Sequence, residues 1–459
     1  MADLDVTPEL LRRYDRPVPR YTSYPTADRF TPDFDAKAYL AALARADSDA
    51  AAPLGLYLHL PFCRHQCAYC GCAMVASTSA ERLSEYLERL FVEIDLVVAH
   101  LPHRRKVAEI HLGGGTPNMY SPSELGRLLA HLRQRFEVLP DAEISIEVDP
   151  REARGDTVGA LRSVGFGRIS FGVQDTADDV QQAIGRVQHL DITREVMEAA
   201  RQHRFDSVNI DLIYGLPKQT RESFARTVQE ALKLGPDRVA LFSFAYIPSQ
   251  RKNQIRIVSD DMPNVDDKLA IFCDARRAFV NAGYVPIGMD HFARPNDELA
   301  RALHNGTLNR TFQGYTVSHA TDILGFGMSA IGEVGGAYAQ NEKNVRAWSQ
   351  RIDARALPIV RGFALSDDDQ LRRFVIRALM CRFQIEDAEL SARFGVTLAG
   401  ALPDALARLA PLVDEGLAKV APGRVEVTPL GRLFVRNVAA AFDAYLHRSQ
   451  AQVPYSRAV

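Results

Sequence analysis

The pattern of apolar and polar positions changes at Leu54, where short apolar runs begin to alternate with stretches whose apolar residues recur at three and four. Short runs of this kind predict buried strands, and the 3.6-residue period predicts amphipathic helices. Alternation of the two is typical of a parallel sheet with crossover helices. The predicted strands are Gly55–Leu60, Val107–Leu112, Glu143–Val148, Arg168–Val173, Val208–Ile213 and Val239–Phe244.

The helices between these strands have recognisable first turns. Thr78 with Glu81, and Ser121 with Glu124, fit capping boxes, and Pro122 suits a first helical position. After Thr78 one apolar face runs through Leu83, Leu87, Leu90, Ile94, Val97 and Leu101. Further helices are expected around 154–164, 191–203, 221–234 and 265–282. The α/β pattern predicts a partial barrel of six strand–helix units, similar to a TIM barrel.

The chain before residue 51 has no sustained period, and its prolines interleave with tyrosines and arginines. We expect residues 1–50 to form an ordered, extended N-terminal arm, because proline restricts the backbone and disordered leaders are poor in aromatics. A flexible leader is the alternative.

The second half is less regular. Residues 284–295 suit an additional strand, the glycine-rich residues 305–340 a loop system close to a ligand, and 345–362 a connector. We place the barrel and its loops in 51–360 and a mainly helical domain in 361–459. The end of that domain resembles a winged helix, which we interpret as a structural lid because no strongly cationic helix stands out.

Polar and glycine residues gather where the predicted strands end. The second strand runs into Gly113–Thr116, the third into Glu147 and Asp149, the fourth into Gln174, and the fifth carries Asp211. In β/α barrels the carboxyl ends of the strands build one active-site face. Each residue alone also suits a helix cap or a turn.

Charge and cysteine content narrow the function. A formal net charge of -2 argues against a polyanionic partner held by bulk electrostatics, so no nucleic acid is expected. The apolar runs are too short to cross a membrane, and the first residues lack an apolar signal core, so we expect a cytoplasmic protein. Four of the six cysteines fall between Cys63 and Cys72, which in a reducing compartment indicates metal binding.

Cys63, Cys67 and Cys70 place three thiolates in one short loop. Tetrahedral zinc would need a fourth ligand, which Cys72 or His65 could supply. Zinc sites more often pair two separated C-x2-C elements, and no second element follows here. Three ligands to a cubane cluster would instead leave one iron open for a small molecule.

The C-x3-C-x2-C spacing after a first strand resembles the radical S-adenosylmethionine superfamily. In that superfamily a 4Fe-4S cluster chelates S-adenosylmethionine and yields a 5'-deoxyadenosyl radical, and the partial barrel is also similar. Within it, the chain resembles the oxygen-independent coproporphyrinogen III oxidases. The stretches that carry this resemblance are PVPRYTSYPTA, CAYCGC, HLGGGTP, EISIEVDPRE, GVQD, NIDLIYGLPKQT, GMDHFARPNDELA and FQGYTVSHATD.

The resemblance implies oxidative decarboxylation of the ring A and B propionates of coproporphyrinogen III to vinyl groups, giving protoporphyrinogen IX in haem synthesis. It implies a reduced flavodoxin- or ferredoxin-type electron donor, and we expect a monomer. The haem chaperones of the same lineage are an alternative, but they lack the CGC cysteine and the PRYTSYP arm present here. Two further alternatives are an iron–sulfur electron carrier and a winged-helix regulator. The carrier would have no use for the strand-end residues, and the regulator would need a basic helix that the sequence lacks.

The resemblance assigns site residues by position. Cys63, Cys67 and Cys70 would hold the cluster, and Tyr69, where relatives often carry Phe, would contact adenine. Two S-adenosylmethionine molecules would be bound by Tyr57, Gly114, Gly115, Thr116, Glu147, Gln174, Arg186, Asp211, Ala245 and Ile331.

The remaining candidates are less closely defined. Cys72 would act near the chemistry outside the cluster. The four carboxylates of the substrate call for arginines, for which Arg20, Arg294 and Arg310 are candidates. His59 shares a strand face with Tyr57 and would either orient the cofactor or be a satisfied core histidine.

Overall fold

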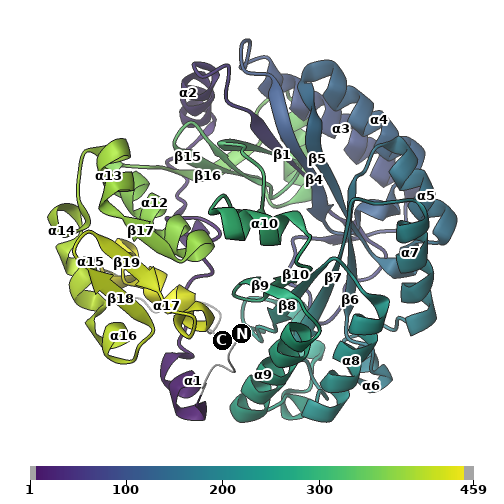
Figure 1. Cartoon of the computed structure of the whole chain (residues 1–459). Coiled ribbons are helices and arrows are strands. Elements are labelled where there is room, and N and C mark those ends of the chain that lie inside the picture. The colour runs from purple at the N-terminus through teal and green to yellow at the C-terminus, as the bar shows by residue number, and fades with distance from the viewer. Residues whose placement is uncertain (1–6, 449–459) are drawn as a thin grey trace. The chain divides into compact units, whose positions relative to one another are not determined.

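The computed structural model describes residues 7–448. These residues form two compact units. The larger unit comprises Phe30–Ala282 and Ser318–Ala364, and the smaller unit comprises the described residues up to Arg29, Gly283–Val317 and those from Leu365 onward. Among the described residues, no helix combines the length and apolar character that crossing a membrane requires. Figure 1 shows the chain coloured by residue number.

All six predicted strands are present in the larger unit. Each pairs in parallel with the next one along the chain, so their carboxyl ends share one edge. These strands are β1 (Leu54–Leu60), β4 (Lys106–Gly114), β5 (Glu137–Val148), β6 (Arg168–Gln174), β7 (Ser207–Tyr214) and β8 (Arg238–Ser243).

The predicted helices follow the strands, and α3, α4, α5, α7 and α8 lie along the outer side of the sheet (Figure 1). In α3 the predicted apolar face is buried from Leu83 to Val97. The helices of this unit are α2 (Ala36–Asp47), α3 (Ala80–Val98), α4 (Pro122–Arg135), α5 (Gly155–Val164), α6 (Asp178–Ala183), α7 (Leu190–Gln202), α8 (Arg221–Leu234), α9 (Val265–Asn281) and α11 (Val345–Asp353).

One of the two predicted capping boxes is wrong. Ser121 and Glu124 form theirs at the start of α4, as predicted. Helix α3 instead begins after Ser79, whose side chain accepts from the backbone N–H of Arg82. Serine is a strong N-cap too, and the capping pattern does not distinguish two adjacent hydroxyl residues.

The prediction of a loop system at 305–340 is also wrong. Within this range β13 (Asp322–Phe326) pairs in parallel with β1, and β14 (Ile331–Val334) and β15 (Ala337–Asn341) continue the sheet antiparallel. The expected connector at 345–362 contains α11 and most of β16 (Ile359–Ala364). Glycine suits these strands because the backbones of neighbouring strands approach each other closely. A Cβ on Gly325 of β13 would lie 2.8 Å from the backbone of Ile331 of β14.

The smaller unit is built from three separated segments. The arm is not extended throughout, because α1 spans Pro8–Tyr14, and α2 of the larger unit follows before residue 51. The predicted strand at 284–295 is an antiparallel pair, β9 (Val285–Gly288) and β10 (His291–Ala293). After these come α10 (Glu298–Asn305), β11 (Asn309–Thr311) and β12 (Gly314–Thr316).

The last segment of the smaller unit is mainly helical, as predicted. It also carries a three-stranded antiparallel sheet in the order β17-β19-β18. Its elements are α12 (Asp367–Arg382), β17 (Gln384–Glu386), α13 (Asp387–Phe394), α14 (Leu398–Ala401), α15 (Pro403–Arg408), α16 (Ala410–Asp414), β18 (Ala418–Ala421), β19 (Arg424–Val427), α17 (Val435–Ala440) and α18 (Ala444–Arg448). The similarity to a winged helix stays a prediction.

Candidate active site at the strand ends

The cysteine loop follows β1 directly. Cys63 ends the two-residue strand β2 (Phe62–Cys63), which pairs in parallel with β3 (Val75–Ala76). Thr116 donates a hydrogen bond to the Cys63 sulfur at 3.2 Å. The guanidinium of Arg151 lies 3.8 Å from the Cys67 sulfur. Within residues 7–448, no three His, Cys, Asp or Glu side chains are grouped as ligands of a single metal ion. A cubane cluster is bound by thiolates at separate irons, so its ligands would lie farther apart than the ligands of a single metal ion.

The thiols of this loop differ in acidity. A hydrogen bond from the Cys72 thiol lowers the pKa of Cys70 to about 6, and in turn the pKa of Cys72 is raised by that hydrogen bond and by the charge on Cys70. Burial raises the pKa of Cys63 to about 11. Cys72 is exposed, whereas Cys67 is buried. Cys72 thus differs from the three other thiols of the loop in its exposure, and its separate role stays a prediction.

Two amide side chains that the sequence did not single out hold this loop from outside. The Asn253 amide donates to the carbonyls of Cys67, Ala68 and Cys70 at 2.9–3.1 Å. The buried Gln254 amide donates to the carbonyls of Tyr69 and Ala245. Both residues lie in the 3-10 helix η4 (Lys252–Arg256). No sequence pattern could have found them, because a short polar turn has no period that points to a distant loop.

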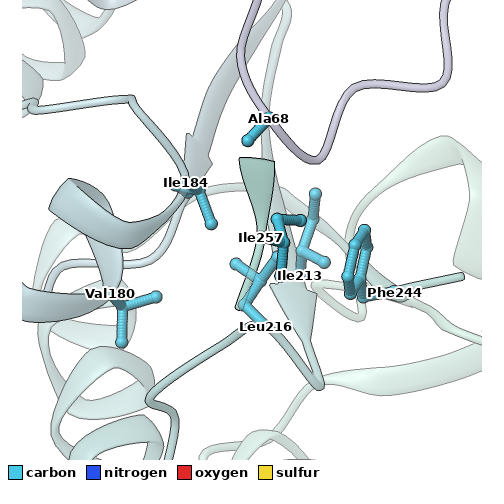
Figure 2. Packing of buried hydrophobic residues seen from close by; sticks show 7 residues of the cluster. All are labelled: Ala68, Val180, Ile184, Ile213, Leu216, Phe244 and Ile257. Atoms are coloured by element: carbon cyan, nitrogen blue, oxygen red, sulfur yellow. The ribbon is translucent and has the colours of Figure 1, made fainter. Parts of the chain in front are cut away.

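An apolar cluster lies beneath the loop. Figure 2 shows Ala68 of the loop with side chains from distant segments, and the half-buried Tyr69 packs against this cluster. The backbone N–H of Ala68 also donates to the carbonyl of Ile184 at 2.8 Å. The cluster consists of Ala68, Val180, Ile184, Ile213, Leu216, Phe244 and Ile257. The loop between the cysteines is thus fixed on one side by apolar packing and on the other by amides.

Two glycines, Gly114 at the end of β4 and Gly115 directly after it, permit a close approach that a side chain would prevent. Gly114 has φ +111°, and a Cβ there would lie 2.5 Å from the imidazole of His59. A Cβ on Gly115 would lie 2.5 Å from the backbone of Pro61. Both glycines are therefore required for β4 to end against the start of the cysteine loop.

Glu147 and Asp211 lie at the same edge. Glu147 accepts from the backbone N–H of Gly114 at 3.1 Å and from His111, 3.4 Å away. Burial would raise the pKa of Glu147, but the bond from His111 and its charge lower it below the ordinary value. Asp211 accepts only neutral donors, Asn209 and Ser170, in its hydrogen bonds. Burial, and then the charge of Glu147, raise the pKa of Asp211 to about 7.

Tyr57 and His59 point to the same side of β1, as predicted. The Tyr57 hydroxyl lies 3.0 Å from Nδ1 of His59, and Nε2 of His59 lies 2.7 Å from the carbonyl of Ala73. Because a carbonyl only accepts, Nε2 carries the proton and Nδ1 accepts from Tyr57. Burial lowers the pKa of His59. His59 is therefore a satisfied, neutral histidine that also ties Tyr57 to the segment after Cys72.

Arg186 and Gln174 carry buried polar atoms without partners. Arg186 donates to the carboxylate of Asp149 at 2.9 Å and to the carbonyl of Gly172 at 2.7 Å, but its Nε has no partner. Oε1 of Gln174 is also unpartnered, and Gln174 adopts φ 68°, in the left-handed region. A Cβ on Gly172 would lie 2.8 Å from the Gln174 amide and 3.2 Å from Arg186, so the two side chains converge there.

The last two residues of the predicted cofactor set are less directly connected. Ala245 accepts from Gln254 and so joins the support of Tyr69. Ile331 is the first residue of β14, in the part of the sheet that the sequence did not predict.

The three predicted substrate arginines all belong to the smaller unit, and each has a neighbour there. Arg20 forms an ion pair with the buried Asp290. Burial would raise the pKa of Asp290, but Arg20 and then His291 lower it far below the usual range. Arg294 lies over the ring of Tyr284, 5.8 Å from its centroid.

Arg310 is only 4% exposed. Its Nη2 donates to the carbonyl of Arg20 at 3.5 Å, but neither Nε nor Nη1 has a hydrogen-bond partner. Its guanidinium lies 4.6 Å from the centroid of the Tyr315 ring. It lines a small pocket with Tyr21, Thr22, Ser23, Tyr24, Arg373, Ile376, Arg377 and Met380. A buried cation with free donors is costly unless an anion or a water reaches it.

Comparison with known proteins identifies the family. The chain matches the radical SAM superfamily over residues 57–231 and the HemN C-terminal domain over residues 365–434. It is 42% identical to the oxygen-independent coproporphyrinogen III oxidases of Salmonella typhimurium and of Escherichia coli K12, each over 98% of both chains. The chain belongs to this oxidase family. A solved structure of the Escherichia coli coproporphyrinogen III oxidase, described as a radical SAM enzyme, superposes with a TM-score of 0.92. That match has 41% identity and covers 96% of this chain and 100% of the other.

Membership of the oxidase family favours the oxidase over the chaperone of the same lineage. It also implies a 4Fe-4S cluster and S-adenosylmethionine, and the residues present fit both. Cys63, Cys67 and Cys70 are free thiols of one loop and could bind the cluster. The unpartnered atoms of Arg186 and Gln174 offer a donor and an acceptor, and the glycine positions leave room where a Cβ would intrude. Such unsatisfied groups are stabilised when a polar ligand reaches them.

Proposed function

We propose that this protein converts coproporphyrinogen III to protoporphyrinogen IX without oxygen, by decarboxylating the propionates of rings A and B to vinyl groups. The observation that supports this best is the full-length similarity to relatives of that activity, combined with thiols and strand ends that fit the implied cofactors. When bound to the reduced cluster, S-adenosylmethionine supplies the radical that removes a hydrogen atom from a propionate β-carbon. The protein itself binds, orients and excludes water.

We assign the cluster to Cys63, Cys67 and Cys70. Arg151 and Arg186 share the carboxylate of Asp149, and Arg151 also contacts the sulfur of Cys67, so cations lie beside the thiolates. That arrangement offsets part of the negative charge that the bound cluster would bring. The exposed thiol of Cys72 is left to act on substrate, since Cys72 contacts the sulfur of Cys70 through its backbone N–H.

The cofactor role of the strand-end residues follows from their charge. Glu147 and Asp211 present carboxylates to a region where S-adenosylmethionine would bring an amino group, a sulfonium and ribose hydroxyls. Arg186 can meet a carboxylate through its unpartnered Nε. Tyr57, Gly114, Gly115, Thr116, Gln174, Ala245 and Ile331 complete the proposed sites for two molecules of this cofactor.

The substrate carries four carboxylates, and Arg310 is the arginine best prepared to receive one. Its two unpartnered nitrogens can form a forked bond to a propionate. Arg20 and Arg294 stay secondary candidates, since Asp290 already neutralises Arg20. We further propose that the protein acts as a cytoplasmic monomer and receives electrons from a reduced flavodoxin- or ferredoxin-type protein.

Anaerobic reconstitution with iron and sulfide, followed by reduction with dithionite, tests the activity directly. Incubation with S-adenosylmethionine and coproporphyrinogen III should give protoporphyrinogen IX and 5'-deoxyadenosine, both quantified by chromatography. A fully loaded, reduced protein that forms neither product would refute the proposal. Formation of 5'-deoxyadenosine without decarboxylation would retain the radical chemistry and reject the substrate.

A further inference from the structure

An exposed surface lies on the outer side of the segment that holds the cysteine loop. Arg251, Lys252, Ile255, Arg256 and Val258 define this surface, which we call the η4 surface, and all of them are exposed. Ile255 is 68% exposed and Val258 is 60% exposed. Ile257 between them is buried in the apolar cluster under the loop. The segment is therefore fixed by its inner residues and presents apolar side chains outward.

These apolar side chains are unusual for this chain. In the described part of the molecule five large hydrophobic residues are exposed, and three of them, Ile255, Val258 and Val265, fall in this short stretch. Single exposed apolar residues are ordinary, but a concentration of them beside charged residues is typical of a protein interaction site. Three cations precede or accompany them, and the nearest acidic residues, Asp260 and Asp261, come only after Val258.

The η4 surface is directly connected to the residues proposed to hold the cluster. Asn253 donates to the carbonyls of Cys67 and Cys70, and Arg256 donates to the carbonyl of Gln66. A protein bound to this surface would therefore be separated from the cysteine loop by little more than one layer of side chains. Electron transfer needs this proximity, because its rate falls steeply with distance.

We infer that the η4 surface is the docking site of an acidic one-electron carrier protein, the partner that reduces the cluster. This inference rests on the proposed function. The carrier loses one electron and the cluster gains it, and no bond forms or breaks. Apolar contacts at Ile255 and Val258 with a cationic rim suit a small, transient interface in which charge sets the rate of encounter.

Two variants test the docking site without touching the loop contacts, Lys252→Glu for the charge and Ile255→Ser for the apolar contact. The matched controls are Lys419→Glu and Val420→Ser on β18, where both side chains are also exposed. Reduced flavodoxin, an acidic flavoprotein, serves as the carrier, and dithionite serves as a small reductant that needs no docking. Stopped-flow absorbance measures cluster reduction in the reconstituted holoenzyme, and calorimetry measures flavodoxin binding.

We expect Lys252→Glu to slow reduction by flavodoxin and to weaken its binding about tenfold at low salt, with a smaller salt dependence than in the wild type. Ile255→Ser should weaken binding by a similar factor, whereas both controls should match the wild type. Dithionite should reduce every variant at the wild-type rate.

Equal rates with flavodoxin in all variants would overturn the inference, as would wild-type holoenzyme that accepts electrons from dithionite but not from flavodoxin. Slower reduction by dithionite in Lys252→Glu or Ile255→Ser would also overturn it, by showing that the segment only shapes the loop. A change from dimer to monomer in Ile255→Ser would assign the surface to a second copy of the chain. If dithionite-reduced wild type forms no 5'-deoxyadenosine, the proposed function itself fails.

Discussion

The two units of the protein carry opposite imbalances of charge. In the larger unit, Asp211 is buried with neutral hydrogen-bond donors, and the carboxylate of Glu147 adds to its charge imbalance. In the smaller unit, Asp290 has Arg20 and His291 as partners, while Arg310 keeps two buried nitrogens without any. The ionised carboxylate of Glu147 at the strand ends of the larger unit suits a cofactor that carries a sulfonium and an amino group. A cationic pocket suits a substrate with carboxylates, which is why we propose that the two units bind different ligands of the reaction.

The largest effect expected in the larger unit is loss of the cluster. Cys63→Ala removes one of the three proposed ligands, so the reconstituted protein should hold no stable 4Fe-4S cluster and show no turnover. Iron and sulfide analysis with absorbance spectroscopy measures this. Cys273→Ala, a cysteine of α9 outside the loop, is the control and should reconstitute as the wild type does. A Cys63→Ala protein with full iron content would remove Cys63 from the ligand set.

Cys72→Ser separates a thiol needed for turnover from a cluster ligand. The backbone N–H of Cys72 donates to the sulfur of Cys70 at 3.4 Å, and a serine at this position keeps that donor. We expect normal iron content and normal 5'-deoxyadenosine formation, with porphyrinogen turnover reduced about 100-fold or more. Loss of the cluster in this variant would instead make Cys72 a ligand and weaken the assignment of an open iron.

The placement of the candidate residues in the larger unit could be predicted because the strands lie in the sheet in their chain order. Glu147 and Gln174 lie at the ends of β5 and β6 and Asp211 lies within β7, so their placement on neighbouring strands required only the alternation of strands and helices. The supports of the loop could not be predicted, because Asn253 and Gln254 act across 183 or more residues through a turn without a pattern. The stretch 305–340 was missed for a related reason. Its glycines allow strands to pack closely, and the same residues in a sequence indicate loops.

The smaller unit was much harder to predict. Arg310 lies with residues of the arm and of α12, so its surroundings come from three distant segments. The sequence could only suggest which arginines are candidates to bind the substrate carboxylates. Which of them is neutralised, as Arg20 is by Asp290, depends on contacts between segments that carry no common period.

Gly114→Ala tests how closely the larger unit is packed at its site. The substitution puts a Cβ 2.5 Å from the His59 ring at a backbone φ of +111°. We expect a loss of about 1–3 kcal/mol in stability and a marked loss of S-adenosylmethionine binding, measured by thermal unfolding and calorimetry. Gly71→Ala in the cysteine loop is the control, because a Cβ there meets nothing within 4 Å. Equal binding by both variants would show that the glycine positions do not shape the cofactor site.

Arg310→Met tests the smaller unit and should leave the larger one unchanged. Replacing a buried cation that has two unpartnered nitrogens costs little stability and can raise it. The KM for coproporphyrinogen III should rise about tenfold, while 5'-deoxyadenosine formation stays at the wild-type rate. Arg301→Met, an exposed position on α10, is the control. An unchanged KM would mean that the pocket around Arg310 holds water and not a propionate.

The smallest effect separates the two buried carboxylates by pH. The pKa of Asp211 is raised from 3.8 to about 7, so between these values the folded protein keeps a proton that the unfolded chain releases. The free energy of unfolding of the apoprotein should therefore fall as pH rises from about 4 to 7. Asp211→Asn should remove this fall and be more stable than the wild type at pH 8, by on the order of 2 kcal/mol.

Asp290→Asn should show the opposite sign, because the lowered pKa of Asp290 gives stability that is present at neutral pH and is lost only in acid. Calorimetric unfolding across this pH range measures both effects, and Asp191→Asn at an exposed position is the control. If both variants shifted stability in the same direction, the assigned pKa directions of Asp211 and Asp290 would be contradicted.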